Sequence, residues 1–179
     1  MPERAPILTK QDIAQRIERL ADSIREKCHI SELALVGIHR RGVPLAERVY
    51  ALLKPRLTGL RIGRVDISLY RDDLKSLEHI PKLVGSDIAF DLDDMHVILF
   101  DEVLQTGRTA RAALEELLNH GRPRKVELAV LIDREGRELP IQADYVGERV
   151  AIGSGQRIAV HFEEVDGEDA VYVQERTNR

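Results

Sequence analysis

Two adjacent acids, followed by a short stretch of hydroxyl and glycine residues, are the side chains of this sequence best suited to binding chemistry. Asp101 and Glu102 directly follow an apolar run, and ionised carboxylates accept hydrogen bonds, which suits the two hydroxyls of a ribose. Residues 106–109 (TGRT) lead into an Ala- and Leu-rich segment. The start of a helix there would offer free N–H groups and a favourable dipole to a phosphate. We therefore expect residues 97–109 to hold a ribose 5-phosphate, with the diol on the acids.

The alternative interpretation of this segment is a solvated strand end followed by a common capped turn. Each residue alone would fit that alternative, but the complete order favours a binding site because each part has a mechanical role. No G-x-x-x-x-G-K-[ST] pattern occurs, so a classical P-loop is excluded. The candidate binding residues are Asp101, Glu102, Val103, Leu104, Gln105, Thr106, Gly107, Arg108 and Thr109.

A second candidate site follows an earlier apolar run, in the sequence GIHRRG at 37–42. Arg40 and Arg41 are cations whose guanidinium groups match phosphate oxygens, and Gly42 opens an expected helix. By itself this short pattern would be equally typical of a solvated turn. Beside the first motif it favours a second phosphate-binding loop.

Alternating helical and strand patterns must position these loops. Apolar periodicity predicts the helices and strands of the core, and the tail alternates as exposed strands do. We expect an α/β fold in one domain covering residues 1–179, with a mostly parallel central sheet flanked by helices and a small antiparallel hood. The expected helices begin at Thr9 and cover 42–53 and 109–119; the expected strands are 33–38, 61–70, 96–100, 125–133, 143–150, 157–165 and 170–173.

Composition excludes several classes of protein. The chain has 179 residues with a net charge of -4 and a pI of about 5.9, so no overall positive field attracts nucleic acid. No apolar run is long enough to cross a bilayer or to form a signal peptide, and we expect a cytoplasmic location. Cys28 is the only cysteine, and the histidines lack ligand spacing, so no structural zinc site is expected.

The segment from Val97 to Thr109 closely resembles the phosphoribosyl pyrophosphate (PRPP) motif of type I phosphoribosyltransferases. Glu102 replaces the more usual second Asp. The resemblance implies that loop 37–42 holds pyrophosphate, often through a non-proline cis peptide, with Arg41 as the main cation and Arg40 assisting. It also implies that residues 71–94 form a mobile loop that closes over PRPP. Arg71, Asp72 and Asp73 at its start are further catalytic candidates.

Other segments are similar to one family in particular, the pyrimidine operon regulators with uracil phosphoribosyltransferase activity (PyrR). The matching segments are ISLYRDDL (67–74), RELPI (137–141), ADYVG (143–147), GRP (121–123) and EEVD (163–166). The resemblance implies that PRPP, uracil and UMP are ligands, that Mg²⁺ arrives with PRPP rather than on protein side chains alone, and that the protein is a homodimer or higher oligomer. It further implies that main-chain groups at Ile132, Asp133 and Arg134 bind uracil. Gln105 stands where purine enzymes of this fold place an acid, which counts against purine bases.

The same resemblance implies an RNA-binding face, on which this sequence differs from its relatives. Arg16, Arg19, Arg137 and Arg149 remain as candidate RNA contacts. Four positions that are neutral or basic in relatives carry Glu18, Asp22, Glu135 and Glu148, and acids there should oppose phosphate binding. Two hypotheses follow: an enzyme whose RNA binding is weak or lost, which these changes favour, or an RNA-binding regulator of attenuation that responds to UMP.

Overall fold

The computed structural model describes residues 5–28, 32–68 and 85–176. Its strands and helices alternate in the first half of the chain, and the second half consists mainly of strands. The elements are α1 (Lys10–Lys27), β1 (Leu33–Ile38), α2 (Gly42–Leu53), β2 (Arg61–Val65), β3 (His96–Leu104), α3 (Arg108–Leu118), β4 (Lys125–Arg134), β5 (Tyr145–Val150), β6 (Gln156–His161), α4 (Glu163–Asp166) and β7 (Ala170–Glu175).

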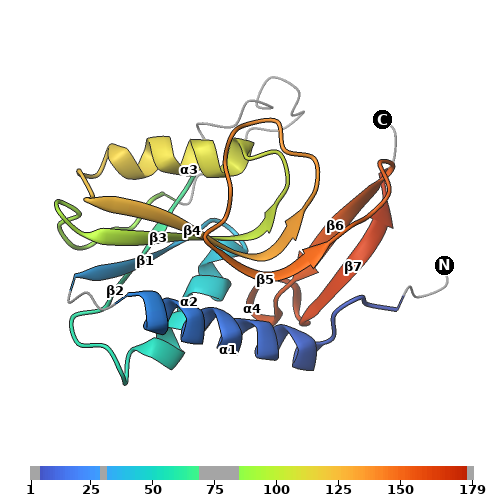
Figure 1. Ribbon diagram of the computed structural model, residues 1–179, viewed down its shortest axis with the longest axis horizontal. Helices are drawn as coiled ribbons and strands as arrows, with labels where there is room; N and C mark the ends of the chain where they lie inside the picture. Colours follow the sequence, from blue (N-terminus) through green and yellow to red (C-terminus); the bar gives the residue numbers. More distant parts are fainter. Residues whose placement is uncertain (1–4, 29–31, 69–84, 177–179) are drawn as a thin grey trace.

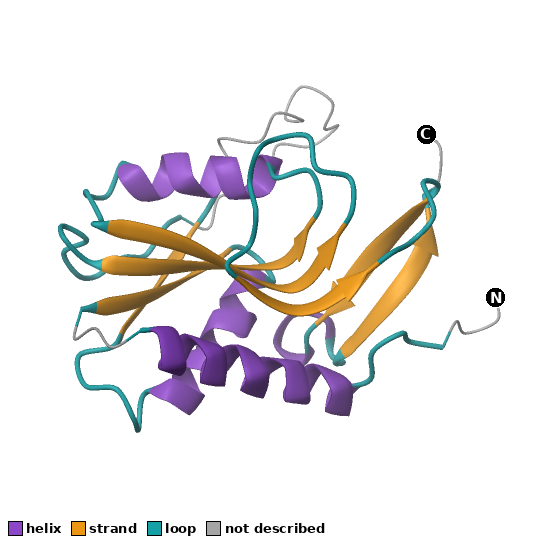
Figure 2. Ribbon diagram, in the orientation of Figure 1, coloured by secondary structure: helices purple, strands orange, loops and turns teal. Residues whose placement is uncertain are grey.

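Five parallel strands form the central sheet in the order β2-β1-β3-β4-β5. Helices α1 and α2 lie on one face of this sheet and α3 lies on the other (Figure 1). Because both faces are covered, the central strands are continuous apolar runs, and all six residues of β1 are buried. Because β3 and β4 are parallel neighbours, their carboxyl ends lie together at one edge of the sheet, beside the antiparallel pair β6-β7 (Figure 2). The expected α/β class and parallel sheet are confirmed. The expected antiparallel hood is also confirmed, and it consists of β6, α4 and β7.

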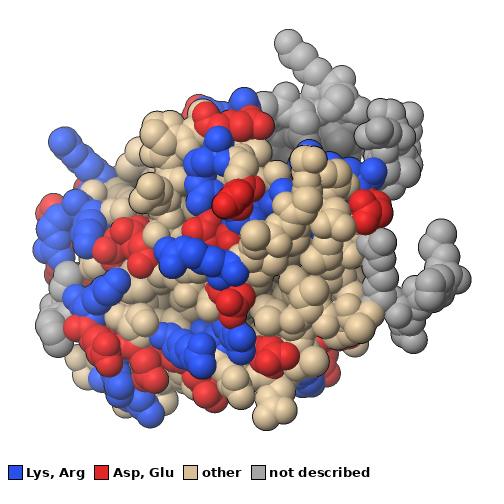
Figure 3. Space-filling model, turned by 45° about the vertical axis from the view of Figure 1, so that its right-hand side comes forward, with Lys and Arg blue, Asp and Glu red and all other residues tan. Residues whose placement is uncertain are grey.

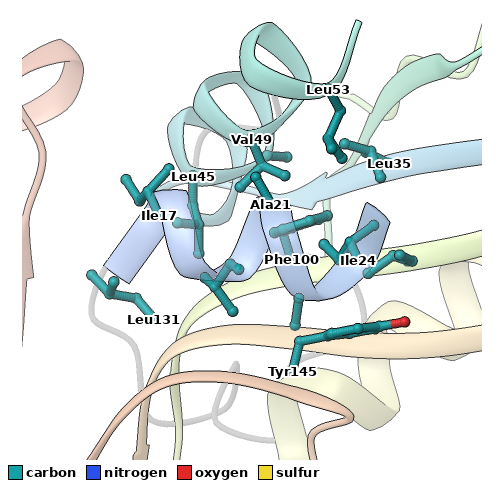
Figure 4. Packing of buried hydrophobic residues seen from close by; sticks show 14 of the residues in the cluster. Ile17, Ala21, Ile24, Leu35, Leu45, Val49, Leu53, Phe100, Leu131 and Tyr145 are labelled. Atoms are coloured by element: carbon teal, nitrogen blue, oxygen red, sulfur yellow. The ribbon is translucent and has the colours of Figure 1, made fainter. Parts of the chain in front are cut away.

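Helix α1 begins as the sequence predicts, with Thr9 as its N-cap and a reciprocal capping box to Asp12. Its buried stripe packs against α2 and the sheet. Figure 4 shows side chains from both helices meeting Leu35, Phe100 and Leu131 of the strands beneath them. This core fixes α2, and with it the loop that precedes α2, against the sheet.

The tail differs from the prediction in two places. Residues 145–150 do not join the hood but extend the central sheet as β5, parallel to β4. The predicted strand at 157–165 ends at His161, and the acids that follow form the short helix α4. The Asp166 N–H donates to the Phe162 carbonyl at 2.7 Å. The chain therefore reverses where the alternating pattern predicted that the strand would continue.

One strand near the site also ends earlier than predicted. The strand predicted at 61–70 stops at Val65, because the Asp66 carboxylate accepts from Ser68 N at 2.9 Å and bends the chain. Part of the predicted mobile loop, 71–84, lies outside the described residues. Its remaining part, 85–94, is held in place: Asp87 forms main-chain hydrogen bonds of 2.8 and 2.9 Å with Arg64, and Leu92 is fully buried. These contacts attach residues 85–94 to β2 and to the core, and closure of the segment over PRPP stays a prediction.

Among the described helices, none combines the length and apolar character needed to cross a membrane.

Candidate active site

A cavity of about 460 Å³ lies between the carboxyl end of β3, the start of α3 and the hood. One wall consists of residues that the sequence predicts, and the other comes from β6 and β7. The lining residues are Arg41, Asp101, Glu102, Val103, Leu104, Gln105, Thr106, Gly107, Thr109, Ala110, Arg157, Ile158, Ala159, Val160, His161 and Gln174. Of the predicted PRPP-binding residues, Arg40, Gly42 and Arg108 are not among them.

Strand β3 continues through both acids instead of ending before them. Asp101 pairs with Val130 and Leu104 with Asp133 of β4, so the acids belong to the rigid sheet and not to a loop. Alternation along the strand sends successive side chains to opposite faces. Leu104 is only 3 % exposed and packs in the core below α3, so it can contribute to the cavity only through its main chain.

Asp101 is the buried member of the acidic pair, with 6 % of its surface exposed. Its Oδ1 accepts a hydrogen bond from the Glu102 N–H at 2.9 Å. Burial, reinforced by the neighbouring Glu102 charge, raises the pKa of Asp101 well above its ordinary value. A hydroxyl donor reaching this carboxylate would stabilise its ionised form, which fits a ribose diol.

Gly107 and Thr106 shape the loop between β3 and α3, which the sequence predicts to hold a phosphate. Gly107 is the N-cap of α3 and adopts a φ of 90°, which favours glycine. The Thr106 hydroxyl accepts from Arg108 N at 3.2 Å, and the Thr106 carbonyl accepts from Glu138 N and Leu139 N at 3.0 Å each. The loop is thereby tied to the segment after β4. The Arg108 side chain pairs with Glu138 at 2.8 Å, which directs it away from the cavity.

The second loop packs against the sheet through its glycine. A Cβ at Gly42 would lie 2.1 Å from the Phe100 carbonyl oxygen, so Gly42 lets α2 begin directly against β3, one residue before Asp101. The peptide bond between His39 and Arg40 is cis, as the family resemblance implies. Arg41 reaches the cavity, whereas Arg40 is exposed outside it.

The residues predicted to bind uracil lie away from this cavity. The Ile132 side chain is fully buried in the core below α1, and its main chain lies in the ladder between Val103 and Glu148. Main-chain groups inside such a ladder are used by the sheet. Arg134 is 7 % exposed. Its Nη1 donates to the Gln156 carbonyl, and its Nε has no hydrogen-bond partner among the described residues.

Asp133, the remaining residue of that set, lines a separate cavity of about 580 Å³ together with Arg137 and Arg149.

Residues of the hood were not predicted as part of the site. Arg157 and His161 come from β6, and Gln174 comes from β7, where it accepts from Arg157 Nε at 3.1 Å. They lie more than fifty residues from the acids in sequence. The alternating pattern of β6 identified a strand but could not indicate which wall it would face.

The other catalytic candidates, Arg71, Asp72 and Asp73, lie outside the described residues. The two described ends that flank their segment meet at one carboxylate. Asp66 accepts from Ser68 N and Oγ through Oδ1, and from Gly85 N at 3.0 Å through Oδ2. A single buried acid therefore holds both stems of the segment.

The four arginines predicted to bind RNA fall into two pairs. Arg16 donates to Glu148 from Nε and Nη2, at 3.1 and 2.9 Å, and its side chain is 16 % exposed. Arg137 donates to the Gln105 carbonyl and to Asp133, both at 2.6 Å. These contacts hold both guanidinium groups against neighbouring elements of the fold, and RNA binding by the two arginines stays a prediction. Arg19 and Arg149 are exposed.

Acidic and basic side chains are interspersed on the face shown in Figure 3.

One cluster of possible metal ligands forms far from the cavity. Cys28, His96 and Glu127 converge although they are far apart in sequence. His96 Nε2 lies 2.8 Å from Glu127, which also accepts from the Tyr145 hydroxyl at 3.0 Å, and His96 Nδ1 lies 4.0 Å from the Cys28 sulfur. Burial raises the pKa of the Cys28 thiol. These contacts satisfy the buried polar groups as a hydrogen-bonded network.

Comparison with known proteins identifies the family. The model of the phosphoribosyl transferase domain matches residues 4–163. This chain is 46 % identical to the Bifunctional protein PyrR of Pelotomaculum thermopropionicum, and the alignment covers 97 % of each chain. The PyrR of Deinococcus deserti is 48 % identical over 94 % of this chain and 93 % of its own, and that of Clostridioides difficile is 42 % identical over 98 % and 100 %. The chain belongs to the PyrR family of type I phosphoribosyltransferases.

Solved structures support the same fold at low identity. A hypoxanthine-guanine phosphoribosyltransferase from Bacillus anthracis aligns with a TM-score of 0.72 and 14 % identity, over 98 % of this chain and 99 % of that one. A hypoxanthine phosphoribosyltransferase from Trypanosoma cruzi aligns with a TM-score of 0.68 and 22 % identity, over 94 % and 93 %. The architecture is thus shared with purine enzymes, so choosing the base for this PyrR chain needs evidence other than the fold.

Proposed function

We propose that this PyrR chain transfers the phosphoribosyl group of PRPP to uracil, forming UMP and pyrophosphate. The observation that carries the proposal is the single cavity in which Asp101 and Glu102, the loop 105–109 and Arg41 meet. Carboxylates for a diol, a helix start for a phosphate and a guanidinium for a leaving group are the three parts that PRPP requires.

In the proposed reaction, the bond between C1 of PRPP and the pyrophosphate oxygen breaks and a bond from C1 to a uracil nitrogen forms, while that nitrogen loses its proton. Asp101 and Glu102 hold the ribose, the N-terminus of α3 holds the 5-phosphate, and Arg41 offsets the charge that develops on pyrophosphate. Mg²⁺ bound to PRPP oxygens would add further charge neutralisation. The carboxylate oxygens of Asp101 and Glu102 are hard ligands of the kind this ion accepts.

Uracil is favoured by family membership and by Gln105. Gln105 is one of the lining residues of the cavity, and its side chain lies against Gly136, where a Cβ would meet its Nε2 at 3.3 Å. An amide neither gives nor takes a proton at neutral pH, so it cannot assist a purine nitrogen as an acid would. The main chain of 132–134 is engaged in the sheet. We therefore propose that the base lies nearer the hood, between Gln105 and β6.

The proposal is tested by measuring UMP formation by wild type and by an Arg41→Ala variant. Wild type should form UMP and pyrophosphate in equal amounts from uracil, Mg²⁺ and PRPP. Arg41→Ala should lower kcat by about 100-fold, because one charge-assisted donor to the leaving group is lost. Arg61→Ala, which removes an exposed arginine at the start of β2, is the matched control. Equal kcat in all three proteins would refute the role of Arg41.

Regulation through RNA is the second proposed function, and the comparisons favour it over loss of RNA binding. Relatives with 42–48 % identity over nearly their full length are named bifunctional. This supports the bifunctional hypothesis better than the enzyme-only hypothesis that the acidic substitutions favoured. Arg19 and Arg149 remain exposed on α1 and β5. A titration of a pyrimidine operon leader hairpin, with and without UMP, tests this function directly, and absence of binding at low salt would exclude it.

A further inference from the structure

We propose that Asp166 of the hood is a positioning residue, which holds the Arg41 guanidinium in the orientation that receives pyrophosphate. The inference rests on the proposed function, because it concerns the leaving group of PRPP. The two residues are 125 positions apart in sequence and meet where α4 touches the start of α2.

The contact between Asp166 and Arg41 is bidentate. Arg41 Nε donates to Oδ2 at 3.0 Å and Nη2 donates to Oδ1 at 2.6 Å. Two parallel hydrogen bonds fix the plane of a guanidinium as well as its position. Nη1 has no hydrogen-bond partner among the described residues, and Arg41 lines the cavity beside the acids of β3. The carboxylate thus occupies one edge of the fork and leaves the other edge for a ligand.

Asp166 is itself held rigidly. Its Oδ2 also accepts from Phe162 N at 3.0 Å, and its own N–H donates to the Phe162 carbonyl at 2.7 Å. Its side chain is 14 % exposed. The hydrogen bond from Arg41 lowers the pKa of Asp166, so the carboxylate is ionised at neutral pH. An arginine fixed by such an anchor has already lost the rotamer freedom that binding would otherwise cost.

A neighbouring cluster of ion pairs around Arg48 provides a control that distinguishes positioning of Arg41 from attachment of the hood to α2. Arg48, two turns further along α2, donates to Glu164 and Asp169 from Nε, Nη1 and Nη2 at 2.6–3.0 Å. It also lies over the Phe162 ring at 5.0 Å. These contacts attach α4 to α2 without lining the cavity. Glu164→Gln therefore weakens the hood attachment while leaving the Arg41–Asp166 pair intact, which makes it the matched control for Asp166→Asn.

The experiment measures UMP synthesis and pyrophosphate affinity in Asp166→Asn, Glu164→Gln and wild type. Asp166→Asn should lower kcat/KM for PRPP by about tenfold or more and weaken pyrophosphate binding, as loss of an orienting partner does at other sites. The KM for uracil should not change, and Asp166→Glu should recover part of the loss. In an Arg41→Ala background the Asp166→Asn effect should disappear.

Each of the following results would overturn the inference. Equal losses in Asp166→Asn and Glu164→Gln would indicate a purely structural role. Tighter pyrophosphate binding by Asp166→Asn would indicate that Asp166 competes with the ligand for Arg41. A loss that persists in the Arg41→Ala background would indicate that Asp166 affects PRPP binding or turnover without acting through Arg41. If wild type binds neither PRPP nor pyrophosphate, the proposed function and this inference both fail, whereas UMP synthesis with no Asp166 effect rejects the inference alone.

Discussion

Gly42 lies so close to Phe100 that a Cβ on the glycine would be 2.1 Å from the phenylalanine carbonyl oxygen. This contact joins the two loops that are predicted to bind PRPP, because α2 begins at Gly42 and Asp101 follows Phe100 on β3. The sheet therefore sets the distance between the predicted pyrophosphate cation, Arg41, and the predicted ribose acid, Asp101.

The first prediction follows from that contact. Gly42→Ala should lower the free energy of unfolding by about 3 kcal/mol or more, because the methyl group would meet backbone that cannot move aside. Gly155→Ala should change stability by less than about 1 kcal/mol, since its Cβ would meet nothing within 4 Å. Urea unfolding of both variants checks this, and equal stability of the two would contradict the packing argument.

A second prediction concerns the ribose. Asp101→Asn should raise the Kd for PRPP by about tenfold or more, because the amide nitrogen cannot accept a hydrogen bond from a ribose hydroxyl. Uracil binding should change little. Asp22→Asn, at an exposed position of α1, is the control. Calorimetric titration with Mg²⁺ and PRPP measures the effect, and unchanged PRPP affinity in Asp101→Asn would remove the assignment of the diol.

The third prediction concerns pH and the ion pairs of the hood. The hydrogen bonds from Arg48 lower the pKa of Glu164, and those from Arg41 lower the pKa of Asp166. Their contribution to stability is therefore complete above the unfolded values, about 4, and is lost as pH falls through the lower folded values. The difference in Tm between wild type and Glu164→Gln should thus be largest near pH 7 and shrink below about pH 4. A difference that stays constant down to pH 3 would argue against the ion pair.

The fourth prediction tests the proposed RNA face. Glu148→Lys should tighten binding of a leader hairpin and steepen its salt dependence by about one to two in log–log slope, because it adds a cation and releases Arg16. Glu115→Lys makes the same charge change on α3, across the sheet from α1 (Figure 1), and should have less effect. Equal effects of the two variants would mean that net charge alone governs binding.

Much of the site followed from local sequence because its parts are contiguous. The acids and the phosphate loop lie within thirteen residues, and a buried strand running into a helix start brings them to one sheet edge. The extension of β3 to Leu104 was missed because Asp101 and Glu102 interrupt the apolar run that indicated the strand.

The hood contributions could not be predicted, for a physical reason. Arg157 and His161 line the same cavity as acids more than fifty positions away, and Asp166 contacts Arg41, which is 125 positions away. Amphipathic alternation states only that a strand has two faces. Arg137 is a second residue whose contacts could not be predicted from the sequence. The sequence predicts it as a candidate RNA contact, whereas the fold shows its guanidinium donating to the Gln105 carbonyl and to Asp133. Only the tertiary structure distinguishes a phosphate ligand from an internal brace.

The most direct test of the central claim is a base-selectivity measurement on the wild-type protein. Purified chain with Mg²⁺ and PRPP is incubated separately with uracil, orotate, hypoxanthine and guanine, and nucleotide products and pyrophosphate are quantified together. The account predicts UMP and pyrophosphate in equal amounts from uracil, with little or no product from the other bases. Conversion of hypoxanthine or orotate without any UMP from uracil would contradict it.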